Sequence, residues 1–181
     1  MQIERPSYRI RPLRQDDARA LFANYKGCSS SAKYLSSPCH GNVRQTEGVI
    51  ARALLAYQQA TPKVLPLAIA LPSDDQVIGL LTFVLHDDYA ELHFGISQRY
   101  RGQGIVLAAC ADALLWLQQR GVGEVRTHPH HAHAASIHIL QKLGFRRVGT
   151  IEQYALFPQI SSQAQDCADM RLRFGDSLAS V

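Results

Sequence analysis

The sequence predicts a mixed α/β protein in which helices cover both faces of one central sheet. Three neighbouring segments carry this prediction. Between Glu91 and Ile96, polar and apolar side chains alternate with the period of a half-buried strand. Residues 105–119 are nearly all apolar and lack glycine and proline, which is typical of a buried helix. Gly102 and Gly104 lie between the two segments and allow the strand to turn sharply into the helix.

The other segments alternate between strand and helix patterns. Asp16 or Asp17 is placed to cap a first helix that runs to about Tyr25, and Thr46 with Glu47 is expected to open a second one. Further strands are expected at 7–13, 65–71, 77–85, 124–127, 145–154 and 167–174, and a short helix at 134–143. Residues 27–44 form a polar connector, and 161–166 a loop that could act as a lid. We therefore expect residues 1–181 to form one domain with its core at about 8–173.

Composition excludes several classes of protein. A chain of 181 residues with 46% hydrophobic and 19% charged residues is typical of a globular domain. The longest apolar run is too short to span a membrane and the first residues do not resemble a signal peptide, so a cytoplasmic location is expected. The net charge of +4 comes from scattered basic residues, which makes nucleic acid an unlikely partner. The four cysteines have no Cys-x-x-Cys spacing, and Cys110 is expected to be a buried hydrophobe.

The turn between the strand and the long helix predicts a site for a polyphosphate. Free backbone N–H groups at a helix start point toward one place, and the helix dipole favours an anion there. The segment lacks the third glycine of a dinucleotide fingerprint and the Gly-Lys-Ser/Thr of a P-loop. Its spacing is Arg99-x-x-Gly102-x-Gly104, and a Leu-Gly-Phe sequence ends at Phe145 about forty residues later.

This combination resembles the GNAT superfamily of N-acetyltransferases, most closely the branch with the ribosomal-protein N-acetyltransferases. The opening at 9–17 and the closing strand at 169–173 resemble the same family. The resemblance implies a GNAT fold that binds acetyl-coenzyme A as co-substrate. It also implies that backbone N–H groups around Phe94, Gly95 and Ile96 bind the carbonyl oxygen. The implied pyrophosphate-binding residues are Arg99, Arg101, Gly102, Gln103 and Gly104, with Ile105 continuing into the helix.

Two side chains of the strand at 91–96 are candidates for the catalytic base. An amine must lose its proton before it can attack a thioester. Glu91 is our first choice, because the resembling branch often has a glutamate six residues before Ser97; the alternative is a solvated strand residue. His93 lies on the same face about 7 Å away, where the family usually has a small residue. It either assists as a base, since imidazole titrates near neutrality, or is structural.

Ser136 is the candidate proton donor to the coenzyme A thiolate. It matches the serine that the branch has eight residues before the glycine of Leu-Gly-Phe, here Gly144. The alternative is that Ser136 caps the following helix. Many other GNAT enzymes have a tyrosine four residues before that glycine, but this chain has Leu140.

Four histidines cluster at positions 128, 130, 131 and 133. His133 stands where the family has an asparagine that contacts the pantetheine or orders the loop, so the resemblance makes His133 a coenzyme-binding residue with an altered hydrogen bond. Imidazoles bind metals, but the cluster lacks a cysteine or acidic residue at suitable spacing. We therefore expect no metal.

The predicted function is transfer of an acetyl group from acetyl-coenzyme A to a primary amine by direct attack, without a covalent enzyme intermediate. The acceptor is either a protein N-terminus or a small amine, and the enzyme could form a homodimer. Two alternatives stay open. The chain could be an acyl-coenzyme A sensor without turnover, which the departures at His133 and Leu140 would allow, or a basic module that binds RNA or the ribosome.

Overall fold

The chain folds around one eight-stranded sheet with the strand order β1-β2-β3-β4-β5-β6-β8-β7. The structure is a computed structural model and describes residues 1–175. The strands are β1 (Ile3–Glu4), β2 (Arg9–Pro12), β3 (Val64–Ala70), β4 (Val77–Leu85), β5 (Ala90–Ile96), β6 (Glu124–Thr127), β7 (Arg146–Ala155) and β8 (Gln165–Arg173). Neighbouring strands are antiparallel except β5 and β6, which pair in parallel. The predicted mixed α/β sheet is therefore confirmed.

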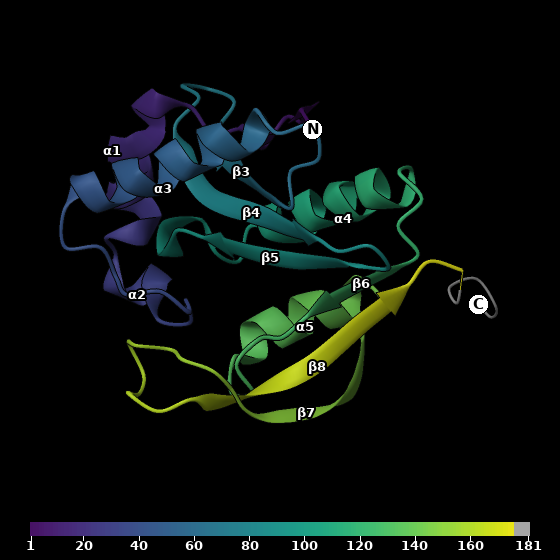
Figure 1. The fold of residues 1–181 in the computed structure, drawn as a ribbon. Helices are drawn as coiled ribbons and strands as arrows, with labels where there is room; N and C mark the ends of the chain where they lie inside the picture. The colour runs from purple at the N-terminus through teal and green to yellow at the C-terminus, as the bar shows by residue number, and fades with distance from the viewer. Residues whose placement is uncertain (176–181) are drawn as a thin grey trace.

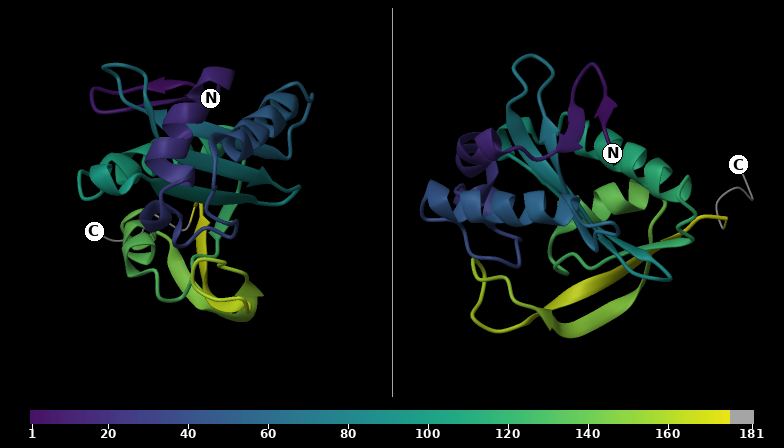
Figure 2. Two further views of the ribbon diagram at one scale, coloured as in Figure 1. Left: turned by 90° about the vertical axis from the view of Figure 1, so that its left-hand side faces the viewer. Right: turned by 45° about the horizontal axis from the view of Figure 1, so that its top comes forward.

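Helices cover both faces of the sheet, as Figures 1 and 2 show. The α-helices are α1 (Ala18–Leu21), α2 (Ser29–Ala32), α3 (Val43–Tyr57), α4 (Ile105–Gln118) and α5 (Ala134–Lys142). A 3-10 turn η1 (Gln15–Asp17) precedes α1, a π-helical turn η2 (Phe22–Lys26) follows it, and a second 3-10 turn η3 (Gln98–Tyr100) follows β5. No helix among the described residues is long and apolar enough to cross a membrane.

Each face of the sheet has its own hydrophobic core. The larger core lies under α4 and α5 and includes Leu81, Phe83 and Leu92 from the sheet. Helix α4, which was predicted as a buried helix from its nearly continuous apolar residues, buries positions 105, 106, 109, 110, 113, 114 and 117. The smaller core joins α1, η2 and α3 to the opposite face of β3 and β4. Cys110 is fully buried, as expected.

Two helix starts differ from the sequence predictions, and one short helix was not predicted. Helix α3 begins at Val43 because the side chain of Asn42 accepts a hydrogen bond from the N–H of Gln45, so Thr46 and Glu47 do not open it. Asp17 stands at the N-cap position of α1, but its side chain makes no capping hydrogen bond to this helix; its carboxylate accepts the N–H of Arg14 instead. The expected connector contains the short helix α2, whose residues are too polar to show a helical pattern.

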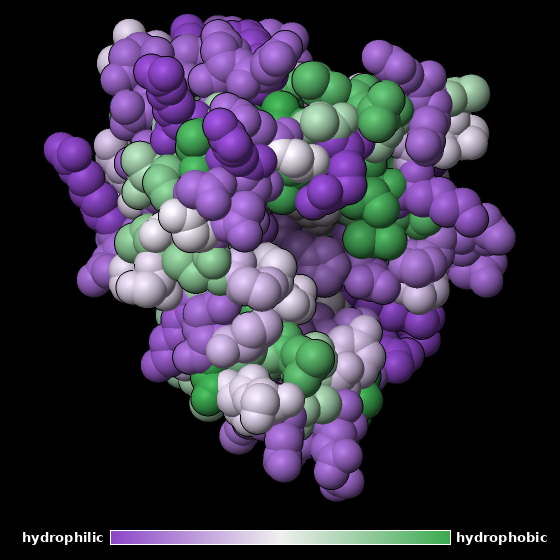
Figure 3. All heavy atoms as spheres, turned by 60° about the vertical axis from the view of Figure 1, so that its left-hand side comes forward, coloured by the Kyte–Doolittle hydropathy of each residue, from purple (hydrophilic) through white to green (hydrophobic). Residues whose placement is uncertain are grey.

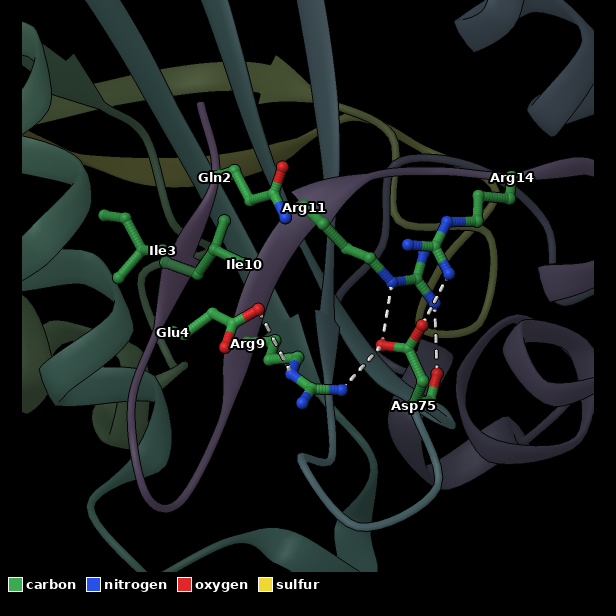
Figure 4. Close-up of a pocket in the computed structure, with 8 residues that line it drawn as sticks. All are labelled: Gln2, Ile3, Glu4, Arg9, Ile10, Arg11, Arg14 and Asp75. Atoms are coloured by element: carbon green, nitrogen blue, oxygen red, sulfur yellow. Dashed lines mark hydrogen bonds and ion pairs between the residues drawn. The ribbon is translucent and has the colours of Figure 1, made fainter.

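The N-terminal hairpin is fixed by a cluster of ion pairs at the sheet edge farthest from β7. Arg11 is 3% exposed and forms two 2.8 Å hydrogen bonds with the carboxylate of Asp17. Asp75 lies between Arg9, Arg11 and Arg14, as Figure 4 shows, and contacts all three guanidinium groups. A small pocket lies beside these residues. Because each of these arginines faces a carboxylate of the same cluster, we interpret the cluster as structural.

Candidate functional site

Strands β5 and β6 separate soon after they meet. They pair only at Ala90 with Val125 and at Glu91 with Arg126. Beyond Thr127 the chain follows β8 instead, since the N–H of Ala168 donates to the carbonyl of Pro129 over 2.9 Å. Residues 92–96 of β5 therefore have no strand partner on this edge among the described residues, and the ribbons of the two strands diverge there (Figure 1); we call this unpaired edge of β5, with the residues that face it, the gap.

Backbone N–H groups of β5 point into this gap. The N–H of Ser97 donates to the carbonyl of Ile78 in the neighbouring strand over 2.7 Å. Because successive N–H groups point to opposite edges of a strand, those of Phe94 and Ile96 point toward the gap. These are donors from the segment that the sequence predicted to bind the carbonyl oxygen.

The turn at 101–104 lies at the end of the gap and leads directly into α4. Gly102 and Gly104 have φ angles of 75° and 76°, a conformation that glycine adopts without strain. Gly104 is the N-cap of α4, and no side chain caps the helix. The N–H groups of the first turn of α4 thus lack a side-chain cap and suit an anion.

The side chains of this turn are held by neighbouring backbone. Arg101 donates to the carbonyl of Ser30 in α2 over 3.0 Å, and Gln103 donates to the carbonyl of Arg99. Arg99 is exposed. The structure therefore brings all the predicted phosphate-binding residues together, with the glycine backbone in the centre and the two arginines around it.

Helix α5 forms the other wall of the gap. His133 is its N-cap residue, so the alternative that Ser136 caps the helix is wrong; Ser136 lies in the first turn and is 8% exposed. The ring of His133 stacks on Tyr34 with 3.9 Å between centroids. Burial, with a smaller effect of Arg101, lowers the pKa of His133 to about 4. His133 is therefore neutral near pH 7, and Tyr34 connects the two walls of the gap.

Glu91 is hydrogen-bonded to two histidines on the face opposite α4. Its Oε1 lies 3.0 Å from Nε2 of His86, and its Oε2 lies 3.0 Å from Nε2 of His93. We call these three residues the His86–Glu91–His93 array. The hydrogen bond from His93 is the largest effect that lowers the pKa of Glu91, so its carboxylate is ionised near neutral pH. The structure places both base candidates side by side, and His86 is an unpredicted third member.

The remaining histidines of the 128–133 cluster lie in two places. The ring of His130 stacks on that of His131 with 4.7 Å between centroids, and it lies 5.4 Å from the ring of Tyr34, which also stacks on His133. Nδ1 of His128 lies 3.2 Å from the hydroxyl of Tyr154, and its Nε2 lies 3.6 Å from Asp169. His130 is 4% exposed, and its Nδ1 accepts the N–H of Ala132. Among residues 1–175, no group of three or more histidine, cysteine or acidic side chains is arranged to hold a metal ion.

Two further residues of the site were not predicted. The hydroxyl of Tyr25 lies over Gly95, and a Cβ at position 95 would come within 1.9 Å of it. A glycine inside a strand is the sequence signal for such a close approach. Gln159 donates to the carbonyls of Ala32 and Ser37, and its side-chain oxygen accepts the N–H of Cys39. No sequence pattern marks this contact, which joins the loop after β7 to the α2 region.

The molecule is hollowed where these segments meet. Figure 3 shows a recess between the part formed by α1–α3 and the part formed by β7 and β8. Gln159 and the stacked rings of Tyr34 and His133 link the two parts. A substrate that reaches the His86–Glu91–His93 array from this face is thus on the opposite side of the sheet from α4.

A mixed sheet with two strands splayed beside a glycine-rich helix start defines the class of protein, an α/β acetyltransferase. The family model described as "Acetyltransferase (GNAT) domain" matches residues 8–146, and the chain therefore belongs to the GNAT acetyltransferase family. The family predicted from the sequence is thus confirmed. No curated protein sequence matches the chain.

Solved structures agree with the fold over nearly the whole chain. The ribosomal-protein-S5-alanine acetyltransferase of Vibrio fischeri has a TM-score of 0.83 at 13% identity, covering 97% of this chain and 98% of that one. A Salmonella typhimurium acetyltransferase described as modifying the N-terminal serine of a 50S ribosomal protein has a TM-score of 0.82 at 14% identity, with 96% and 99% covered. The microcin C7 self-immunity acetyltransferase, solved with acetyl-CoA and AMP, has a TM-score of 0.83 at 15% identity, with 94% of each chain covered.

Proposed function

We propose that this protein transfers the acetyl group of acetyl-coenzyme A to a primary amine by direct attack of the amine on the thioester. One observation carries the proposal: the gap between β5 and β6 joins an anion-binding turn to a carboxylate flanked by imidazoles. The turn suits the pyrophosphate of the donor, and the carboxylate suits an ammonium group that must lose a proton.

The residues present fit acetyl-coenzyme A. The pyrophosphate would contact the backbone at Gly102 and Gly104 and the first turn of α4, where N–H groups have no side-chain cap. The extended arm of the coenzyme would replace the missing strand beside β5, and the N–H groups of Phe94 and Ile96 are the donors for its carbonyl groups. Ser136 and His133 lie on the opposite wall of the gap, where Ser136 is our candidate donor to the thiolate.

The acceptor side favours a cationic substrate. Glu91 and Asp169 both have lowered pKa values, owing first to hydrogen bonds from His93 and Arg171 respectively, and so remain negative near neutral pH. Solved structures with this fold include a ribosomal-protein-S5-alanine acetyltransferase and an enzyme described as modifying the N-terminal serine of a ribosomal protein, which supports a protein N-terminus as acceptor. A small amine is the second acceptor class, and the microcin immunity enzyme shares the same fold.

The test is release of the coenzyme A thiol from acetyl-coenzyme A with a panel of amines. The panel contains peptides that begin with alanine or serine, polyamines, amino acids and aminoglycosides. We expect turnover with one class and a fall of about tenfold or more in E91Q at unchanged acetyl-coenzyme A affinity. The matched control is E47Q, because Glu47 is exposed on α3.

Two results would contradict the proposal. Tight binding of acetyl-coenzyme A without turnover on any amine would favour the sensor. Salt-sensitive binding of RNA without coenzyme binding would favour the nucleic-acid module.

A further inference from the structure

Both oxygens of Glu91 are already engaged in the free protein. A carboxylate only accepts hydrogen bonds, so each imidazole must present an N–H to it, and Nε2 of both His86 and His93 must carry the hydrogen. The Glu91 side chain is 18% exposed, whereas that of His93 is 50% exposed. An incoming amine therefore meets His93 more readily than it meets Glu91.

The other ring nitrogen of His93 is available for a proton. A neutral imidazole with hydrogen on Nε2 has a lone pair on Nδ1. No described residue makes a hydrogen bond to this nitrogen. His93 is also two residues from Gly95 on the same strand face, next to the N–H groups that point into the gap.

We propose that His93 is the group that takes the proton from the attacking amine, that Glu91 acts through His93, and that His86 is a positioning residue for Glu91. The proposal rests on the proposed function and assigns the roles within its site. The acceptor first loses one proton to solvent and becomes a neutral amine. As its nitrogen bonds to the acetyl carbon, a second proton moves to Nδ1 of His93 and the carbon–sulfur bond breaks. The thiolate takes a proton from the hydroxyl of Ser136, which solvent reprotonates, and the imidazolium releases its proton to solvent, so one amine and one thioester give one amide and one thiol.

Proton transfer from the amine to His93 is favoured over direct proton transfer to Glu91. Hydrogen bonds from His93 and His86 lower the pKa of Glu91, which makes its carboxylate a weaker base. Imidazole is the side chain that most often serves as a general base near neutral pH. Glu91 then fixes the tautomer of His93 and stabilises the imidazolium that forms, as a carboxylate does in other carboxylate–histidine pairs.

His86 is itself held in place. Its ring stacks on Tyr89 with 4.2 Å between centroids, and the guanidinium of Arg126 lies 3.9 Å from the centre of the Tyr89 ring. Arg126 and Glu91 form the last residue pair between β5 and β6. The array is therefore held in place where the pairing of the two strands ends and the gap begins.

Several charged or titratable groups share this face and influence its pH dependence. They are His86, Tyr89, Glu91, Arg126, His128, Tyr154, Asp169 and Arg171 around His93, with Tyr25 from η2 over Gly95. Arg171 is hydrogen-bonded to Asp169, so its charge is largely compensated. Glu91 is the one carboxylate within hydrogen-bond distance of His93 among the described residues, and its removal should have the largest effect on the tautomer of His93.

The first arm of the experiment needs no substrate. Nitrogen-15 NMR of the histidine rings in the free protein should show His93 with its hydrogen on Nε2 at high pH. In E91Q the Nε2 hydrogen loses its carboxylate partner, so the ring should move toward a mixture of the two tautomers, whereas H86A should keep the Nε2 form. A His93 ring with hydrogen on Nδ1, or a tautomer ratio unchanged in E91Q, would overturn the proposal even if the protein acetylates amines.

The second arm uses an amine that is turned over. H93Q should lower kcat by about a hundredfold, with a residual rate that rises steadily with pH, while E91Q should lower kcat only about tenfold. H138Q is the matched control, because His138 is exposed on α5, and it should keep full activity. Full activity in H93Q with a larger loss in E91Q would instead make Glu91 the base. If no amine reacts, the proposed function is wrong. The NMR measurement of the His93 tautomer still shows in that case whether Nε2 of His93 donates to Glu91.

Discussion

Replacing Gly104 by alanine should separate the role of this glycine in folding from its role in binding acetyl-coenzyme A. Gly104 has φ of 76° and Gly121 has φ of 79°, and the two residues flank opposite ends of α4. A Cβ at either position meets no atom within 4 Å. Both substitutions therefore carry the same backbone penalty, about 1 kcal/mol for an L-residue in the left-handed region, without a steric clash.

Only Gly104 lies where the pyrophosphate would approach the backbone. A Cβ there would push the anion away from the N–H groups at the start of α4, weakening about two hydrogen bonds worth about 1 kcal/mol each. The sum of about 2 kcal/mol corresponds to about a 30-fold rise in the Kd for acetyl-coenzyme A. Thermal unfolding without ligand should show equal losses for G104A and G121A, and calorimetric titration should show weaker binding for G104A alone. Affinities within twofold of each other would refute the assignment of this turn as the phosphate site.

Three further outcomes follow from contacts already described. D17A should lower the free energy of unfolding by about 3 kcal/mol, because it leaves the buried guanidinium of Arg11 without its bidentate partner, and D16A should have little effect; denaturant titration measures both. Hydrogen bonds from Arg5 lower the pKa of Asp112, so the contribution of Asp112 to the free energy of unfolding is present above about pH 4 and is lost as the pH falls further. When unfolding is measured across pH 2–7, the stability of D112N should therefore fall less toward acid pH than that of the unchanged protein. S136A should reduce kcat about tenfold with unchanged coenzyme affinity, since a hydroxyl is a weak acid, and an unaltered kcat would remove Ser136 from the mechanism.

Local patterns were enough to predict the strand–turn–helix unit. The alternation at 91–96, the two glycines and the apolar run from Ile105 all report interactions between residues close in sequence, and the structure has β5, the turn and α4 there. Helix α3 was placed three residues late, because Asn42 rather than a threonine–glutamate pair provides its cap. Helix-capping propensity does not distinguish between Asn42 and Thr46, because both residue types are favoured at the N-cap position.

The parts that escaped prediction depend on contacts between distant segments. His86 is in a turn, and only the register that pairs Leu85 with Ala90 brings it to Glu91. Gln159 reaches the backbone of the α2 region across 120 to 127 residues of sequence. Tyr25 meets Gly95 because η2 packs on the sheet. A polar or aromatic residue in a loop has no periodic signal, so such long-range partners cannot be found from one sequence.

The short contact between β5 and β6 has a mechanical consequence. With only two residue pairs joined, the sheet consists of a five-stranded part and a three-stranded part that share one hinge near Glu91. The free protein should then unfold with low cooperativity between the two parts, and amide hydrogens of β6 and β8 should exchange faster than those of β3 and β4. Acetyl-coenzyme A bound along β5 would form hydrogen bonds with the unpaired edge of this strand and would couple the two parts of the sheet. Its binding should therefore stabilise the sheet, and its release should uncouple the two parts again.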